Sequence, residues 1–183
     1  MTFSEMVLRR ESCRAYADKP VSREDLTKIV EAGALAPSAC NSQPWKFIVV
    51  DEAEAKKRLC DALVTNEGFT GAAFRDQVPA YIVLIEQPAN VVQSVRDHYG
   101  DTQRFAQGDI GMAAMNMCYQ ATDLGLSTCV IGMNEQEKME AALGIPAGAV
   151  VRLVLAVGYS AEDKEPRKKV RKPFDEVVSF NRW

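Results

Sequence analysis

Three polar side chains near the start of the sequence alternate in a pattern that suits phosphate binding. Arg10, Ser12 and Arg14 lie two residues apart, so in an extended segment they point to the same face. Two guanidinium groups and a hydroxyl on one face match a phosphate, which accepts paired, charged hydrogen bonds. From these residues alone, the alternative is a solvated basic patch on the surface.

A second polar stretch lies between two prolines, Pro37 and Pro44. The enclosed side chains are small or carry amides: Ser38, Ala39, Cys40, Asn41, Ser42 and Gln43. Each proline fixes its own φ and disfavours a helical conformation at the residue before it. The stretch is therefore predicted to be a shaped loop with free backbone N–H groups. Such a loop can hold a polar cofactor, but the same residue types also dominate ordinary turns.

The elements that must position these residues alternate between helices and strands. Hydrophobic periodicity predicts helices over about 3–10, 22–36, 52–64, 105–124 and 134–143, with N-caps at Ser22, Asp51 and Asn134. Apolar and β-branched runs predict strands over 45–50, 80–86, 127–131 and 149–157. Residues 87–103 are predicted to be irregular, and their lone His98 is expected at the surface rather than in catalysis. Residues 65–76 read as a connection, with a mobile flap as the alternative.

The last two long segments have unusual compositions. The predicted helix over 105–124 is apolar around most of its circumference and contains Gly108 and Gly111, so we expect it in the core or at a subunit interface. From Ser160 the chain is strongly charged, and Lys169 and Arg171 again place two cations on one face. A disordered basic tail is one interpretation. Apolar residues at its far end favour packing on another surface: Phe174, Val177, Val178, Phe180 and Trp183.

Composition limits the class of protein. The chain has 183 residues, of which 47% are hydrophobic and 26% charged, so residues 1–183 are predicted to form one globular domain. A net charge of −3 argues against general binding of nucleic acid or anionic membrane, and no apolar run reaches the roughly 20 residues of a membrane span. Five cysteines without a CxxC pair and a single histidine predict reduced thiols, a cytoplasmic protein and no metal site.

Taken together and in order, these blocks resemble the nitroreductase family of FMN-dependent oxidoreductases. The matching blocks are Arg10-x-Ser12-x-Arg14, the loop from Pro37 to Trp45, Cys129 to Gly132, Gly158-Tyr159, and Lys169-x-Arg171-x-Pro173. The resemblance implies an α+β fold, a three-layer α/β/α sandwich with a central, mostly antiparallel sheet. It also implies a homodimer in which the tail, residues 160–183, extends across the partner subunit and two FMN sites lie at the interface.

The resemblance also implies a role for individual residues. Arg10, Ser12, Lys169 and Arg171 would hold the FMN phosphate, and Arg14 would reach the pyrimidine edge of the flavin. The loop of the neighbouring subunit would contribute Pro37, Ser38, Ala39, Asn41 and Gln43, while Ile131 and Gly132 would lie beside flavin N5. Two positions depart from the family pattern: Glu11 stands where a second basic residue is often found, and Cys129-Val130 stands where many short members have Cys-Trp.

The activity implied is transfer of hydride from NADH or NADPH through flavin N5 to a small electron-poor acceptor, such as a nitroaromatic or a quinone, in a ping-pong sequence. Because the flavin carries the chemistry, no catalytic side chain is predicted. Two alternatives stay open. One is a specialised flavin enzyme, such as a dehalogenase or dehydrogenase, with residues 65–76 or 98–105 as a lid. The other is a protein that binds flavin without turnover.

Overall fold

The computed structural model describes residues 1–64, 74–161 and 166–183. Four antiparallel strands form a sheet in the order β1-β2-β4-β3. Their bounds are Trp45–Val50 for β1, Ala80–Glu86 for β2, Ser127–Ile131 for β3 and Val150–Gly158 for β4. The first three strands begin and end where the sequence predicted, and β4 lies one residue further along the chain.

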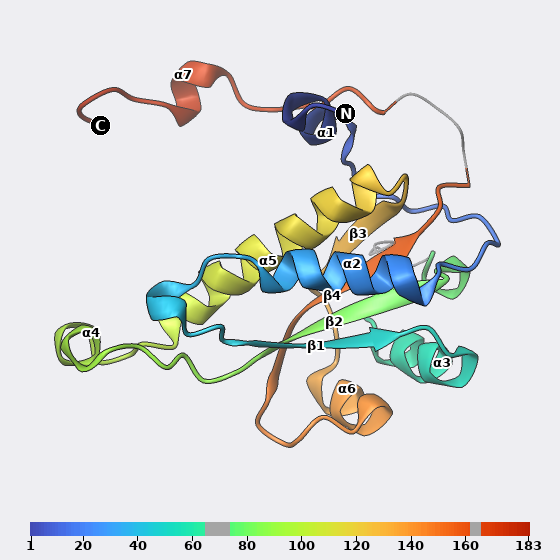
Figure 1. Cartoon of the computed structure of the whole chain (residues 1–183), viewed down its shortest axis with the longest axis horizontal. Coiled ribbons are helices and arrows are strands. Elements are labelled where there is room, and N and C mark those ends of the chain that lie inside the picture. The colour runs from blue at the N-terminus through green and yellow to red at the C-terminus, as the bar shows by residue number, and fades with distance from the viewer. Residues whose placement is uncertain (65–73, 162–165) are drawn as a thin grey trace.

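Helices cover both faces of this sheet, as Figure 1 shows. Every residue of β2 is buried, so side chains that point in both directions along this strand need a covering layer. Ile82 and Leu84 pack in one core cluster with Leu26 and Met117, while Tyr81 packs in another with Leu59 and Met139. The first cluster belongs to α2 (Arg23–Ala34) and α5 (Arg104–Asp123), the second to α3 (Ala53–Ala62) and α6 (Gln136–Leu143). The fold is therefore the expected α+β three-layer sandwich.

The long helix α5 packs closely against α2. A Cβ atom on Gly33 would lie only 2.3 Å from Cε and 2.8 Å from Cγ of Met117, so the glycine lets the two helices approach. On the core side α5 is fully buried, for example at Ala113 and Cys118, whereas Met112 on another side is 41% exposed. The expectation of a core helix is confirmed for one side of α5, and the other side is open in the single chain.

Three local predictions were wrong. Residues 87–103 contain a helix, α4 (Gln93–Tyr99), which is anchored because the Arg96 guanidinium donates to Val91 O and Asn90 Oδ1. The N-cap of α3 is Glu52, since Arg23 engages the Asp51 carboxylate at 2.7 Å instead. The N-cap of α6 is Glu135 rather than Asn134, because Asn134 forms an extended bridge with Leu63.

The two terminal segments lie beyond the same end of the sandwich, with the N and C ends themselves apart (Figure 1). Helix α1 (Phe3–Arg9) contacts α5, where the rings of Phe3 and Tyr119 lie 5.4 Å apart. The C-terminal segment runs past α1 and contains one short helix, α7 (Phe174–Val177). Of residues 65–76, predicted to be a connection with a flap as the alternative, residues 65–73 fall outside the described residues, and Arg75–Gln77 form a 3₁₀ turn. Among the helices that the structure describes, none has the length and apolar character of a membrane span.

Candidate functional site

The segment that carries Arg10, Ser12 and Arg14 is extended and lies along the edge of β3. Ser12 forms a parallel bridge with Thr128, and the Cys13 N–H donates to Thr128 O at 2.9 Å. An extended backbone alternates its side chains, so Cys13 is buried while Arg14 is exposed. The predicted extended conformation is confirmed at Ser12 and Cys13, and the sheet edge fixes it in place, but the alternation is incomplete because Glu11 lines the same cavity as Arg10 and Ser12.

The C-terminal segment returns to the same place. The Lys169 ammonium donates to Arg10 O at 2.6 Å, and the Arg167 guanidinium donates to Ser12 O at 2.9 Å. Together the two segments line a cavity of about 310 Å³, formed by Arg10, Glu11, Ser12, Arg14 and residues 167–171. The structure thus gathers the four residues predicted to hold a phosphate, although they lie at opposite ends of the sequence. Below, this cavity and its lining are called the cationic cradle.

Among the described residues, the lining of the cationic cradle holds more cations than carboxylates. Burial lowers the pKa of Lys169, and the nearby Arg10 lowers it further. For Glu11, burial alone would raise the pKa, but hydrogen bonds from Arg167 outweigh burial and hold the pKa below its ordinary value. The single carboxylate of the cradle is therefore ionised and engaged by Arg167. The other cations keep an excess of positive charge, which suits an anion with several acceptor oxygens.

The ion pair of the cationic cradle, between Glu11 and Arg167, was not predicted from the sequence. Arg167 contacts both Glu11 and Ser12, whereas the sequence alone predicts no more than a place in a charged tail. Glu11 was noted only as a departure from the family pattern. The signal that could have joined them is their opposite charge, but 156 residues separate them, and charge alone does not select Arg167 from the other cations of the tail.

The loop between Pro37 and Pro44 has an unusual backbone. Cys40, Asn41 and Gln43 have φ of 52°, 53° and 46°, a left-handed conformation that costs a side-chain-bearing residue roughly 1–2 kcal/mol. Hydrogen bonds hold it: the Gln43 N–H donates to Ser38 Oγ at 3.0 Å, and the Ala39 N–H donates to the Asp109 carboxylate at 3.1 Å. Asp109 lies on α5 and is only 4% exposed. The loop is therefore shaped, as the sequence predicted, but the expected free backbone N–H groups are mostly engaged, because those of Ala39, Asn41, Ser42 and Gln43 donate within the chain. The anchor Asp109 was not foreseen.

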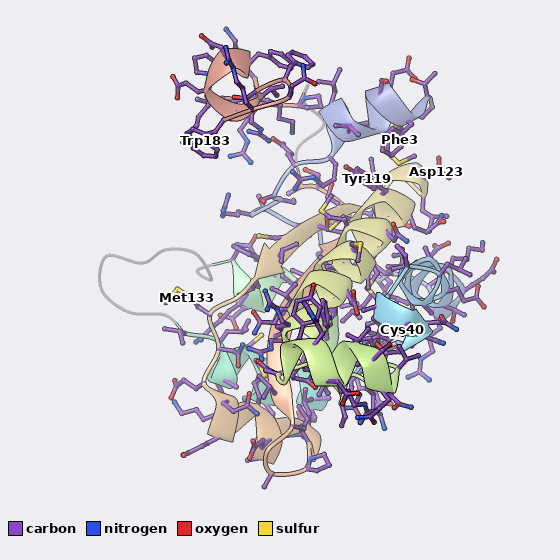
Figure 2. The ribbon with its side chains drawn as sticks, turned by 90° about the vertical axis from the view of Figure 1, so that its left-hand side faces the viewer. Phe3, Cys40, Tyr119, Asp123, Met133 and Trp183 are labelled. Atoms are coloured by element: carbon purple, nitrogen blue, oxygen red, sulfur yellow. The ribbon has the colours of Figure 1, made fainter. Side chains whose placement is uncertain are left out.

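The loop and the cationic cradle lie toward opposite ends of α5 in one chain. The loop contacts α5 at Asp109, and α1, which leads into the cradle, contacts it at Tyr119. Those ten residues correspond to about 15 Å along a helix, and Figure 2 places Cys40 well away from Tyr119 and Phe3. The structure therefore does not bring the two halves of the predicted site together within one subunit.

The end of β3 provides the third part of the predicted site. Ile131 is buried, and Gly132, which follows it, is exposed; apart from its chain neighbours, no described residue has an atom within 4 Å of the position that a Cβ would take. The described residues therefore leave the space beside this backbone open. Cys129 is also buried, and burial raises the pKa of its thiol, so the thiol stays protonated. Val130, at the position of the family's tryptophan, is 38% exposed and presents an aliphatic surface.

Comparison with known proteins decides the family. The model of the nitroreductase family matches residues 7–159. This chain belongs to the nitroreductase family. A relative from Archaeoglobus fulgidus, provisionally named NADH dehydrogenase/NAD(P)H nitroreductase, is 33% identical over 88% of this chain and 87% of its own length.

Solved structures agree with this assignment. A nitroreductase family protein from Clostridium difficile 630 superposes with a TM-score of 0.82 at 26% identity, covering 100% of both chains. An FMN-dependent nitroreductase from Clostridium difficile R20291 superposes with a TM-score of 0.72 at 28% identity. The superposition covers 97% of this chain and 98% of that protein's chain. The nitroreductase fold expected from the sequence is confirmed.

Proposed function

We propose that this nitroreductase-family protein is an FMN-dependent NAD(P)H oxidoreductase that reduces small electron-poor compounds. Its relatives are named as NAD(P)H nitroreductases or NADPH-dependent oxidoreductases, and one solved relative is named as FMN-dependent. The observation that carries the proposal for this chain is the cationic cradle. It joins Arg10, Ser12, Lys169 and Arg171 around one cavity, and its excess charge matches a phosphate monoester of about −2.

The residues present fit FMN at the phosphate end. Lys169 has a lowered pKa because burial and Arg10 disfavour its charge, and the negative charge of a bound phosphate would offset both effects. Ser12 supplies a hydroxyl between the two arginines. The Glu11 carboxylate would repel the phosphate, but it is engaged by Arg167 at 2.8 Å. Arg10, Ser12, Lys169 and Arg171 would therefore hold the phosphate.

Other residues would hold the ring. Arg14 extends the cradle along the edge of β3, and a fixed cation there would stabilise negative charge on the pyrimidine edge of a reduced flavin. The open backbone at Ile131 and Gly132 would admit the ring, because glycine lets a ligand approach closely. The loop residues Pro37, Ser38, Ala39, Asn41 and Gln43 would contact the ribityl chain and ring edge. Since this loop lies far from the cradle of its own chain, we propose that it serves the partner subunit of a homodimer.

When bound, FMN supplies hydride transfer at N5, alternately from NADH or NADPH and to an acceptor such as a nitroaromatic or a quinone, in a ping-pong sequence. The protein's own work is to bind and orient the cofactor and to tune its potential. No acid or base of the chain has to move a proton for the hydride step. We accordingly assign no catalytic side chain.

The proposal is tested with purified full-length protein reconstituted with FMN. We expect a yellow protein whose flavin absorbance bleaches under anaerobic conditions with NADH or NADPH and recovers on addition of a nitroaromatic or quinone. Initial rates with both substrates varied should give parallel double-reciprocal lines. A protein that retains FMN but does not bleach would be a flavin carrier without turnover, and one that binds no FMN would contradict the proposal entirely.

A further inference from the structure

Glu11 is a carboxylate in the lining of a cavity otherwise rich in cations. A negative charge beside a phosphate site weakens anion binding by Coulomb repulsion. If this were its only effect, Glu11 would be a simple defect of the site. Its contacts indicate a different role.

Glu11 fixes both the side chain and the main chain of Arg167. Its Oε2 atom accepts from Arg167 Nε at 2.8 Å and from the Arg167 backbone N–H at 3.3 Å. The same guanidinium donates through Nη2 to Ser12 O at 2.9 Å. Two residues further, Lys169 donates to Arg10 O. These contacts align the C-terminal segment with residues 10–12.

Apolar packing contributes little to this alignment. Val170 lies between the two cations of the segment and is 87% exposed, and Arg167, Lys168 and Arg171 are exposed as well. A single solvent-exposed ion pair stabilises little. A carboxylate that holds a guanidinium and a backbone N–H together, however, restrains the direction of the chain as well as one side chain. In the described part of the chain, four hydrogen bonds join residues 167–169 to residues 10–12.

We propose that Glu11 is a positioning residue: through Arg167 it holds residues 167–171 against residues 10–14, so that Lys169 and Arg171 face the phosphate of the cofactor. This inference rests on the proposed function, because it assigns the cradle to a phosphate-bearing cofactor. In this role the Glu11 carboxylate strengthens cofactor binding, whereas its negative charge alone would weaken it.

The variant Glu11→Gln separates the two effects because they have opposite signs. Removing the carboxylate's charge would tighten FMN binding by electrostatics alone. If Glu11 positions the segment, FMN binding should weaken by about tenfold, the equivalent of one lost charge-assisted contact. Glu54→Gln, on the exposed surface of α3, changes net charge equally and should leave FMN affinity unchanged. Affinity is measured by titration of flavin fluorescence.

A double-mutant cycle tests whether Glu11 acts through Arg167. If it does, adding Glu11→Gln to Arg167→Gln should produce no further loss of FMN affinity. A further loss of similar size would overturn the proposal, as would unchanged or tighter binding by Glu11→Gln alone.

A readout that needs no flavin keeps this test separate from the proposed function. In FMN-free, full-length protein, Glu11→Gln should accelerate tryptic cleavage at Lys168 and Lys169 several-fold, because a released segment is cut faster. Glu54→Gln should not. Unchanged cleavage would overturn the positioning role even if FMN affinity fell. If wild-type protein bound no FMN yet Glu11→Gln accelerated cleavage, the proposed function would fail while the attachment of the segment through Glu11 stood.

Discussion

Among the cations of the cationic cradle, Lys169 has a pKa that is lowered by its surroundings. Its pKa lies below the ordinary value of 10.5 because burial and the neighbouring Arg10 disfavour the protonated form. The free protein therefore gives up this proton more readily than an exposed lysine does. An anion in the cationic cradle acts in the opposite direction and stabilises the ammonium.

We predict that FMN affinity falls as pH rises through the lowered pKa of Lys169. Near and above this pKa the free protein has lost the Lys169 proton, and FMN binding restores it. FMN binding is therefore coupled to proton uptake and weakens as the pH rises. Below that pKa the ammonium is already charged and the affinity is constant. In Lys169→Arg the guanidinium stays protonated throughout, so its alkaline decrease should disappear. Titrations of flavin fluorescence from neutral pH to pH near 10 check this, and a decrease that persists in Lys169→Arg would assign the titration elsewhere.

Replacement of Arg10 and Arg171 together by alanine should weaken FMN retention by about 3 kcal/mol or more, since two charge-assisted contacts are lost. Lys169 keeps its bond to the backbone carbonyl of residue 10, so the change leaves that attachment in place. Lys56→Ala with Lys57→Ala, on α3, removes the same net charge elsewhere and serves as the control. Equal FMN affinity in the Arg10/Arg171 variant and wild type, measured by equilibrium dialysis, would show that the phosphate lies elsewhere.

At the scale of elements, the contact between α2 and α5 depends on one missing side chain. Gly33→Ala would place a Cβ 2.3 Å from Met117 Cε, and we expect overpacking to lower the free energy of unfolding by about 1–3 kcal/mol. Gly108→Ala is the matched control, because a Cβ there meets no atom of the described residues within 4 Å, and alanine has a higher helix propensity than glycine. Urea unfolding followed by circular dichroism measures both. Equal stability of Gly33→Ala and wild type would mean that Met117 repacks freely.

Asp109 connects α5 to the loop between Pro37 and Pro44. Its carboxylate accepts a hydrogen bond from the Ala39 N–H. The residues that follow include Cys40, Asn41 and Gln43, whose left-handed backbone is strained. In Asp109→Ala the loop loses this anchor, so amide hydrogen exchange at residues 39–43 should rise at least tenfold while exchange in β2 changes little. Asp109→Asn retains an acceptor oxygen and should remain close to wild type. A uniform rise across the sheet would indicate loss of global stability instead.

Elements were predictable from the sequence where local residues decide the conformation. The β-forming runs WKFIVV and AYIVLIE gave β1 and β2 their correct ends, since strong β-formers end there at turn or charged residues. The helix caps near Asp51 and Asn134 were misassigned because both residues contact distant partners instead. Asp51 pairs with Arg23, and Asn134 forms a β-bridge with Leu63. Helix α4 was missed because its sequence has no clear hydrophobic periodicity. It is held instead by bonds from Arg96 to Asn90 and Val91 in the irregular segment before it.

The candidate site was predictable in its residue types but not in its pairings. Alternation gave Arg10, Ser12 and Arg14 a common face, and the resemblance joined them to Lys169 and Arg171. The bond between Glu11 and Arg167 spans 156 residues, and no local pattern specifies it. Asp109 likewise reads as one more polar residue on a helix until the fold brings it to Ala39.

At the scale of the whole molecule, one chain supplies two separated halves of the proposed site. The cradle and the loop contact α5 about 15 Å apart, near Tyr119 and Asp109 respectively. The C-terminal segment also leaves its aromatic side chains unpacked, because Phe174, Phe180 and Trp183 are 68%, 76% and 113% exposed. Large aromatic side chains in contact with water favour burial against another surface. A second copy would supply both the missing loop and this surface.

Removal of residues 173–183 tests that arrangement. The truncated chain keeps residues 167–171 and hence the cradle, but it loses the exposed aromatic side chains, each worth roughly 1.5–3 kcal/mol on full burial. We expect full-length protein to be dimeric by light scattering, the truncated chain to be monomeric, and its FMN affinity to fall because no partner loop covers the flavin. The full-length variant Phe174→Ser/Phe180→Ser/Trp183→Ser keeps the backbone and should behave in the same way. A truncated chain that stays dimeric with unchanged FMN affinity would place the subunit contact elsewhere.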